Sequence, residues 1–291
     1  MNKLRGTGIA LITPFNQDGS IDFPALEKLV DYSTQGGVEY LVCLGTTAET
    51  PTLTKDEKKQ IVSTIKSANA GKLPLVLGIG GNNTEEVKIE FKETDLSDFT
   101  AVLSASPAYN KPNQEGIYQH YKVLAENTDA KIILYNVPSR TGSNINPETT
   151  LRLAQDFSNI IAIKEASPNF LQSTDIIKDK PDDFEVVSGD DEFGLPMTLA
   201  GGKGVISVIA QGLPELYTEM IRLGLDKKVD EAYSLHYKLM GITRSIYEEG
   251  NPCGIKSLLS HKGICKPYTR LPLVPASEKL TGKIKELVNK L

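Results

Sequence analysis

The sequence predicts an α/β protein built as a closed (β/α)8 barrel, the TIM-barrel class, with a helical appendage at its C-terminal end. Short apolar runs alternate with amphipathic segments, which is typical of parallel strands joined by right-handed helical crossovers. Eight such units occur, in a span close to the roughly 250 residues of a typical barrel. A doubly wound open sheet is the structural alternative, but the turn after the first strand, Thr13-Pro14-Phe15-Asn16, lacks the glycines usual there.

The eight predicted strands are short apolar runs bounded by polar or turn residues. Continuous apolar runs, rather than alternating ones, indicate strands that are buried on both faces, as in a parallel sheet. The predicted strands are Gly8–Ile12, Tyr40–Leu44, Leu75–Ile79, Ala101–Ser104, Lys131–Tyr135, Ile160–Lys164, Glu185–Ser188 and Val205–Val208.

The intervening helices are predicted from their first turns and their apolar stripes. Asp22 precedes the first helix, and Thr54 with Glu57 forms a capping box at the start of the helix that follows the second strand. Asn146-Pro147 is a typical N-cap and first helical residue after the fifth strand. The strand and helix alternation stops near Asp226, so we divide the chain into a barrel with the active site, residues 1–226, and a C-terminal helical region, residues 227–291.

Composition excludes several classes of protein. The chain of 291 residues has a net charge of −5 and no basic block, which argues against a nucleic-acid partner. No apolar run reaches the roughly 18 residues of a membrane span, and the first six residues do not form a signal peptide. The three cysteines, Cys43, Cys253 and Cys265, are few and far apart, so we expect reduced thiols in a cytoplasmic protein. The three histidines show no metal-ligand spacing, and His120 is expected on a helix face rather than as a general base.

The stretch NIIAIKEAS, residues 159–167, carries the least ordinary signal in the chain. Four apolar residues run straight into Lys164 and Glu165. Lysine is seldom buried without a partner, because burial disfavours its charged form. Lys164 either extends to the surface, pairs with a carboxylate, or is a catalytic amine. A direct pair with Glu165 is awkward, because adjacent residues on a strand point to opposite faces.

The C-terminal ends of barrel strands, with the loops that follow, form the active site in this class of fold. The segments at these positions are GTTAE at 45–49, GGNN at 80–83, PAYN at 107–110, YNVPSRTG at 135–142, Lys164 and SGDD at 188–191. They offer an amine, phenols, hydroxyls and a guanidinium, a set that suits Schiff-base chemistry. Taken singly, each residue also has a structural explanation: the threonines can cap turns, the tyrosines can pack, and Arg140 can lie on the surface.

The motifs GTTAE, YNVPSRTG, IAIKEAS at 161–167, SGDD and GVISV at 204–208 together resemble the dihydrodipicolinate synthase (4-hydroxy-tetrahydrodipicolinate synthase) family. This family belongs to the pyruvate-dependent class I aldolases of the N-acetylneuraminate lyase superfamily. The resemblance covers essentially the whole chain. It implies a lyase that condenses pyruvate with L-aspartate 4-semialdehyde to 4-hydroxy-tetrahydrodipicolinate, in lysine and diaminopimelate biosynthesis, with no cofactor and no metal.

The resemblance also implies a role for each matching residue. Lys164 would form the imine with pyruvate, and Thr46 would link Tyr135 to Tyr109 in a proton relay. In this family the second tyrosine reaches in from a neighbouring subunit, so a homo-oligomer, a dimer of dimers, is expected. Thr47 would hold the pyruvate carboxylate, and Arg140 would bind the carboxylate of the semialdehyde. Gly189 and Ile206 would line the pocket through their backbone carbonyls.

Lysine-sensitive members of the family bind L-lysine at a subunit interface, and this chain departs from them there. Lys55 and Lys58 replace histidines, and Ala108 replaces a tyrosine, whereas Asn82 and Glu86 match. We therefore expect weak inhibition by L-lysine, or none.

Two alternative functions are considered. An N-acetylneuraminate lyase or a 2-keto-3-deoxy-sugar-acid aldolase would share the lysine but accept a different aldehyde, and Arg140 favours a small acidic one. A barrel that binds a keto acid only as a sensor would lack part of the catalytic set, and none of it is missing. An assay that offers pyruvate with the semialdehyde, against one that offers N-acetylneuraminate, separates the enzymes.

Overall fold

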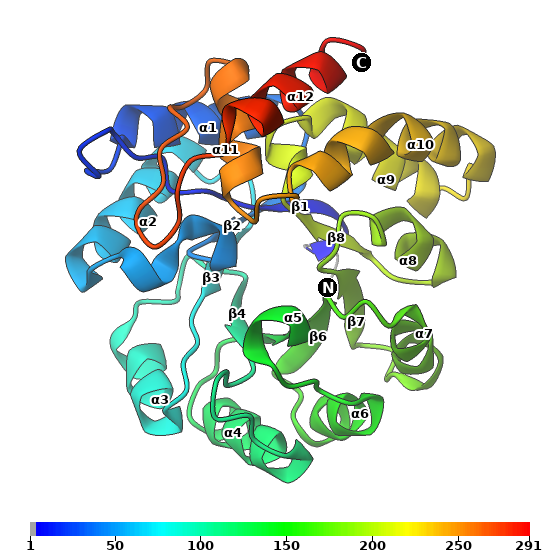
Figure 1. Cartoon of the computed structure of the whole chain (residues 1–291). Coiled ribbons are helices and arrows are strands. Elements are labelled where there is room, and N and C mark those ends of the chain that lie inside the picture. The colour runs from blue at the N-terminus through cyan, green and yellow to red at the C-terminus, as the bar shows by residue number, and fades with distance from the viewer. Residues whose placement is uncertain (1–3) are drawn as a thin grey trace.

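The computed structural model describes residues 4–291 and confirms the closed barrel. The eight strands are all parallel and pair in chain order, and β8 closes the barrel against β1. Figure 1 shows the strands at the centre of the molecule and the helices in a ring around them.

The strands are β1 (Gly6–Ala10), β2 (Tyr40–Cys43), β3 (Leu75–Gly78), β4 (Ala101–Ala105), β5 (Ile132–Asn136), β6 (Ile160–Glu165), β7 (Glu185–Ser188) and β8 (Gly204–Ser207). The α-helices are α1 (Phe23–Gln35), α2 (Lys55–Asn69), α3 (Thr84–Glu93), α4 (Gln114–Glu126), α5 (Pro138–Thr141), α6 (Pro147–Asp156), α7 (Phe170–Asp179), α8 (Gly194–Ala200), α9 (Pro214–Leu225), α10 (Val229–Ser245), α11 (Cys253–His261) and α12 (Glu278–Val288). Short 3-10 turns are η2 (Thr46–Ala48), η3 (Thr50–Thr52) and η4 (Ile209–Gln211).

The first strand lies two residues earlier than its apolar pattern predicts. Leu11 and Ile12 are buried, as a strand pattern requires, but they follow the strand instead of ending it. The backbone N–H of Ile12 donates to the side chain of Gln211 at 3.0 Å. A side chain therefore takes the place of a neighbouring strand, and burial alone did not reveal this change of partner.

The capping residues predicted from the sequence begin the expected helices. The Asp22 carboxylate accepts from the backbone N–H of Ala25 at 3.0 Å. Thr54 and Glu57 exchange both bonds of a capping box at the start of α2. Asn146 precedes α6 and Pro147 is the first residue of that helix, where its missing N–H leaves no bond unmade.

Two apolar clusters result from the alternation of side chains along the strands. The inner cluster fills the barrel and includes Val42, Val76, Leu103, Ile133, Tyr135, Ala162, Val187 and Ile206. The larger, outer cluster packs the other faces of the strands against the helices. On β6, Ala162 belongs to the inner cluster and Ile163 to the outer one. Because successive side chains point to opposite faces, Lys164 faces the barrel interior and Glu165 faces the helices.

The C-terminal region lies against one side of the barrel and is not separate from it. Helix α10 packs on α8 and α9, α11 packs on η4, and α12 packs on α10 and α11. Figure 1 shows these helices beside α1, β1 and α9. The region predicted as a helical appendage is therefore helical and continues the packing of the outer ring.

A buried ion pair joins this region to the loop after β2. The Lys256 ammonium, on α11, is 0% exposed and donates to the Glu49 carboxylate at 2.5 Å and to the backbone carbonyl of Tyr268 at 2.8 Å. The second oxygen of Glu49 accepts from the backbone N–H of Arg270 at 3.0 Å. Burial lowers the pKa of Lys256, and the Glu49 carboxylate opposes that shift. The pair is satisfied on both sides, so removing one partner leaves a buried charge alone.

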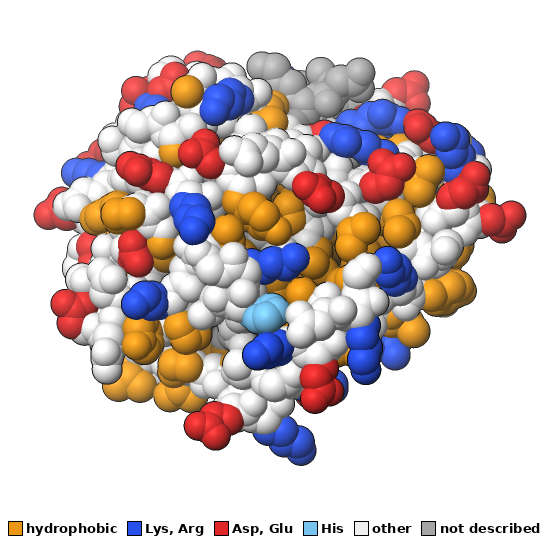
Figure 2. Space-filling model, turned by 90° about the horizontal axis from the view of Figure 1, so that it is seen from above, with side chains coloured by type: hydrophobic (Ala, Val, Ile, Leu, Met, Phe, Trp, Pro, Cys, Tyr) orange, Lys and Arg blue, Asp and Glu red, His pale blue; other side chains and the backbone are white. Residues whose placement is uncertain are grey.

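The surface is mixed in charge. Figure 2 shows acidic and basic side chains interspersed on one face, with smaller apolar areas between them. Within residues 4–291, no helix is long and apolar enough to cross a membrane, and no group of three His, Cys, Asp or Glu side chains is placed to hold a metal ion. Cys43, Cys253 and Cys265 are buried free thiols.

The buried pair generates a stability prediction. Lys256→Met should lower the free energy of unfolding by roughly 3–5 kcal/mol, because it strands the Glu49 carboxylate. The double variant Glu49→Gln/Lys256→Met should recover most of that loss. Lys283→Met, which breaks an exposed pair with Glu248, is the matched control and should change stability by about 1 kcal/mol or less. Urea unfolding at fixed protein concentration measures all four proteins. Equal losses in the two single lysine variants would contradict the prediction.

Candidate active site at the C-terminal ends of the strands

Lys164 and Tyr135 lie side by side inside the barrel mouth. The register of β5 and β6 pairs Tyr135 with Lys164 directly. The Lys164 Nζ lies 4.4 Å from the centre of the Tyr135 ring, and the lysine is 5% exposed. No carboxylate forms an ion pair with Lys164 within residues 4–291. The amine thus lies beside a phenol, among the apolar side chains that fill the barrel, and this setting suits Schiff-base chemistry.

Gly189 leaves room for the lysine side chain. A Cβ at this position would lie 2.9 Å from Cε of Lys164 and 2.7 Å from Cβ of Ala166. Any side chain at position 189 would therefore displace the amine. The backbone N–H of Gly189 donates to the carbonyl of Glu165 at 2.7 Å, which extends the β6–β7 pairing to this point. Ile206, on β8, is buried in the inner cluster of the same barrel.

On the outer side of β6, Glu165 is buried in a network of amides. Its carboxylate accepts from the Asn136 amide at 2.9 and 3.0 Å, from the Gln172 amide at 2.8 Å and from the backbone N–H of Ser167 at 2.7 Å. Burial raises the pKa of Glu165, and these donors oppose the shift. Asn136 and Glu165 are the residues directly after Tyr135 and Lys164, so the outer network fixes the ends of both strands.

Thr46 and Thr47 follow β2 in the 3-10 turn η2, and three contacts hold this turn. The Thr13 hydroxyl donates to the carbonyl of Ala48 at 2.8 Å. Glu49 has a positive φ of 55° and places its carboxylate on Lys256, described above. Thr47 is buried, and its Oγ1 accepts from the Asn251 amide at 2.9 Å.

Arg140 lies on the short helix α5, directly after β5, and its side chain is exposed. Figure 1 shows α5 over the end of the barrel. The loop after α5 is held by Asn136, whose side-chain Oδ1 accepts from the backbone N–H of Ile145 at 2.9 Å. The Arg140 guanidinium is therefore exposed at the C-terminal end of the barrel.

The structure does not bring Tyr109 to the other predicted relay residues. Tyr109 is 90% exposed and lies in the loop between β4 and α4 with a positive φ of 65°. The loop is held by a hydrogen bond of 2.8 Å from the backbone N–H of Ala108 to the Asn82 side chain. The Tyr109 ring is therefore exposed to solvent and does not pack against its own chain.

The remaining predicted residues occupy the outer helices and loops near this point. Lys55 lies in the first turn of α2 with Lys58 one turn later, and Glu86 lies in the first turn of α3. Lys55, Asn82 and Glu86 are exposed, and Lys58 is half-buried.

His120 is a core residue of α4, in agreement with the expected helix position. Its Nδ1 lies 2.9 Å from the Thr84 hydroxyl, and burial lowers its pKa to about 4. The ring is thus neutral near pH 7 and contacts none of the rim residues above.

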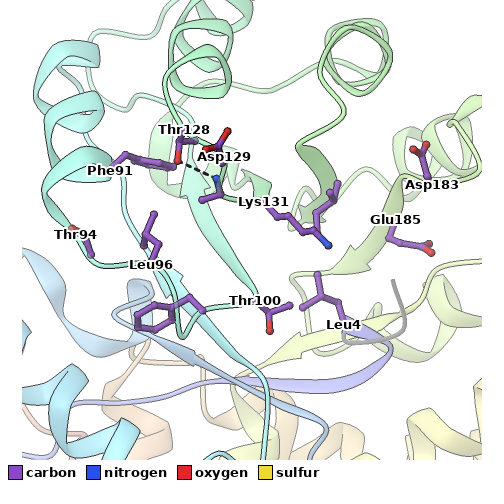
Figure 3. A pocket seen from close by; sticks show the side chains of 13 residues that line it. Leu4, Phe91, Thr94, Leu96, Thr100, Thr128, Asp129, Lys131, Asp183 and Glu185 are labelled. Atoms are coloured by element: carbon purple, nitrogen blue, oxygen red, sulfur yellow. Dashed lines mark hydrogen bonds between the residues drawn. The ribbon is translucent and has the colours of Figure 1, made fainter.

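A well-defined cavity lies away from this site. It measures about 630 Å³ and lies at the opposite, N-terminal ends of the strands, where Thr100, Lys131 and Glu185 line it together with Leu4. Figure 3 shows these side chains around it. We assign the reaction to the other end, because catalytic groups in (β/α)8 barrels lie at the C-terminal ends of strands.

Sequence reasoning missed Asn251 and Lys256 as supports of the rim, and it named Glu49 only as part of the GTTAE segment. No local signal indicates a contact between Asn251 and Thr47. The one local signal for Lys256 was a lysine within the apolar sequence GIKSLL. A lysine in that setting indicates a buried partner, but nothing nearby in the sequence identifies it as Glu49.

Known proteins resemble the chain over nearly its full length. The model of the dihydrodipicolinate synthetase family matches residues 3–291. A 4-hydroxy-tetrahydrodipicolinate synthase of Flavobacterium psychrophilum is 56% identical over 98% of this chain and 97% of its own length. The crystal structure of dihydrodipicolinate synthase from Thermotoga maritima superposes with a TM-score of 0.96 at 38% identity, covering 99% of this chain and 98% of that one. A structure described as a monomeric dihydrodipicolinate synthase variant has a TM-score of 0.95 at 38% identity, covering 98% and 96% of the two chains.

The fold and the rim define a (β/α)8 barrel with an amine at the centre of its C-terminal face. The sequence matches extend over nearly the whole chain, so they establish the family as well as the fold. The chain belongs to the dihydrodipicolinate synthetase family.

Proposed function

We propose that this protein is a 4-hydroxy-tetrahydrodipicolinate synthase, a class I aldolase-type lyase that condenses pyruvate with L-aspartate 4-semialdehyde. The observation that carries the proposal is the buried Lys164 amine beside the Tyr135 ring, in a family whose relatives bear this name. The product belongs to lysine and diaminopimelate biosynthesis, and the three free thiols support a cytoplasmic enzyme.

The chemistry follows from the positions of the side chains. In its unprotonated form, the Lys164 amine attacks the ketone of pyruvate, and loss of water gives a protonated imine. The imine withdraws electrons, so a methyl proton is lost and an enamine forms. The enamine carbon attacks the aldehyde of the second substrate and makes the new C–C bond. The amine of that substrate then displaces Lys164 and closes the ring, with Tyr135 exchanging the protons.

The other rim residues bind and orient in this proposal. Thr47 holds the pyruvate carboxylate, while Gly189 and Ile206 line the pocket. Arg140 recognises the carboxylate of the semialdehyde, because a planar guanidinium pairs with a carboxylate through two parallel hydrogen bonds. Thr46 passes protons between Tyr135 and Tyr109.

Borohydride reduction in the presence of pyruvate tests the imine. One pyruvate-derived group should attach to Lys164 of the wild-type protein, and Lys164→Ala should abolish both the labelling and the activity. Mass spectrometry of the digested protein locates the group. Undiminished labelling of Lys164→Ala would show that another amine reacts.

Arg140→Ala serves as the matched variant in the same experiment. It should be labelled normally but lose at least about tenfold in kcat/KM for the semialdehyde, since a hydrogen-bonded charge pair is worth roughly 1.5–3 kcal/mol. Substitution of N-acetylneuraminate for both substrates should give no cleavage by the wild type.

We propose further that Tyr109 acts in the site of a second copy of this chain, so that the active enzyme is a homo-oligomer, a dimer of dimers. Its 90% exposed ring and its positive φ support this role, because an ordered loop that holds an aromatic ring in solvent suits an interface. The relay to Thr46 would then be completed only across the subunit boundary.

Mixed oligomers test this arrangement. Tyr109→Phe and Lys164→Ala subunits, each inactive alone, should regain part of the activity when mixed, because one site of each mixed pair receives both groups. Size-exclusion chromatography with two affinity tags verifies the mixing. Unchanged inactivity in verified mixed oligomers, or full activity of a monomer, would place Tyr109 in the site of its own chain.

Inhibition by L-lysine should be weak or absent. Lys55 and Lys58 are three residues apart on α2 and share a face, where two positive charges oppose a ligand of net charge +1. Ala108 offers no ring to cover the ligand's methylene chain, and the side-chain Oδ1 of Asn82 already accepts from the backbone N–H of Ala108.

Titration of L-lysine into the steady-state assay, with pyruvate near its KM, measures this inhibition. The double variant Lys55→Ala/Lys58→Ala should become more sensitive than the wild type if the two charges oppose binding. Strong inhibition of the wild type at sub-millimolar lysine would contradict the interpretation of these residues.

A further inference from the structure

Asn251 reaches the pyruvate-binding turn from the far end of the chain. It lies just before α11, and its Nδ2 donates to Oγ1 of Thr47 at 2.9 Å, across 204 positions of sequence. Thr47 is 2% exposed, so this contact is largely removed from water. A hydrogen bond in such a place has a fixed geometry, and its direction has consequences for any ligand of Thr47.

The direction of this bond determines what the threonine hydroxyl can offer. A hydroxyl has one donor proton and two acceptor positions. Because Asn251 is the donor, the Thr47 oxygen accepts, and its own proton remains uncommitted. Thr47 Oγ1 forms no other hydrogen bond within residues 4–291. The proton can therefore point to a ligand.

The opposite orientation of the Asn251 side-chain amide would leave a less favourable set of unpartnered atoms. Asn251 Oδ1 is buried and has no hydrogen-bond partner within residues 4–291. If the amide were turned over, Oδ1 would meet Thr47, and the NH2 group, with two protons, would be left without a partner instead. Among backbone groups, buried N–H donors without a partner are rarer than carbonyl oxygens without one, and the same preference is applied to this side-chain amide. The orientation with Nδ2 on Thr47 leaves the smaller deficit.

The same C-terminal region holds the turn at a second point. Glu49, two residues beyond Thr47, is bonded to the Lys256 ammonium and to the backbone N–H of Arg270. The turn is thereby clamped on both sides of Ala48. Asn251 consequently meets a hydroxyl whose backbone cannot move away.

We propose that Asn251 is a positioning residue that fixes Thr47 as a hydrogen-bond donor to the carboxylate of the keto acid. The inference rests on the proposed function, in which Thr47 holds that carboxylate. An ionised carboxylate only accepts hydrogen bonds, so it needs a donor here, and an acceptor in its place would repel it.

Asn251→Asp inverts this arrangement with little change of shape. An ionised aspartate can only accept hydrogen bonds. The Thr47 hydroxyl would therefore donate to it, and only the lone pairs of Thr47 Oγ1 would face the ligand. The pyruvate concentration that half-saturates borohydride labelling of Lys164 should rise at least about tenfold. Asn251→Ala leaves the hydroxyl free to rotate and should raise it by only about two- to fivefold. The KM for the semialdehyde should stay within about twofold in both variants, because that substrate adds after the imine has formed.

A double-mutant cycle with Thr47→Val separates hydrogen-bond direction from simple charge repulsion. If Asn251→Asp acts through the hydroxyl, Thr47→Val/Asn251→Asp should need no more pyruvate than Thr47→Val alone. If the added charge repels pyruvate directly, the penalty persists in the Thr47→Val background. Asn289→Asp, at the exposed end of α12, adds the same charge to the same region and should leave half-saturation unchanged.

The outcomes are distinct. A wild-type protein that pyruvate does not label at all overturns the proposed function. Two results would overturn the role of Asn251 alone, provided that the wild type is labelled normally. One is an Asn251→Asp variant that half-saturates at the wild-type pyruvate concentration. The other is an increase in that concentration that persists in the Thr47→Val background. Urea midpoints verify folding. If Asn251→Asp does not fold, the cycle is run with Asn251→Ala, where additive effects with Thr47→Val overturn the inference.

Discussion

The register between β5 and β6 is the constraint on which the rest of the site depends. Tyr135 stands opposite Lys164 and Asn136 opposite Glu165. A slip of one residue would turn Lys164 toward the helices and Glu165 into the barrel, because side chains alternate along a strand. The outer pair prevents this, since Asn136 and Glu165 are joined by hydrogen bonds of 2.9 and 3.0 Å. The amine inside the barrel is thus positioned by a carboxylate and amides outside it, where no substrate reaches.

The rim of the barrel is stabilised by residues from the C-terminal helical region. The turn with Thr46 and Thr47 is fixed by Asn251, Lys256 and Arg270, all of which lie beyond the last strand. The division at residue 226, made on the sequence pattern, stays a prediction about periodicity. In terms of interactions, the C-terminal helices and the second loop act together, and a description of the site that ended with β8 would be incomplete.

The sequence predicted most of the fold because the relevant signals are local. Apolar runs and capping residues lie within a few positions of one another, and they located all eight strands to within two residues. The strand-end rule then brought Lys164, Tyr135, Thr47 and Gly189 to one rim. Tyr109 is not assembled there, because a single chain offers it only solvent. Asn251 and Lys256 escaped prediction because their partners lie 204 and 207 positions away, and no periodic pattern records a contact of that range.

The contact between Lys256 and Glu49 has a consequence for how the protein is made. A ribosome releases the chain from its N-terminus, so Thr47 and Lys164 leave the exit tunnel well before Asn251 and Lys256 do. At that stage all the strands are available, yet Glu49 has no cation and the turn after β2 lacks its support. The turn with Thr46 and Thr47 therefore gains its supporting contacts only when the last quarter of the chain has emerged. The strands that position Lys164 and Tyr135 can pair before this happens, so the turn that carries Thr47 is the part of the rim that is completed last.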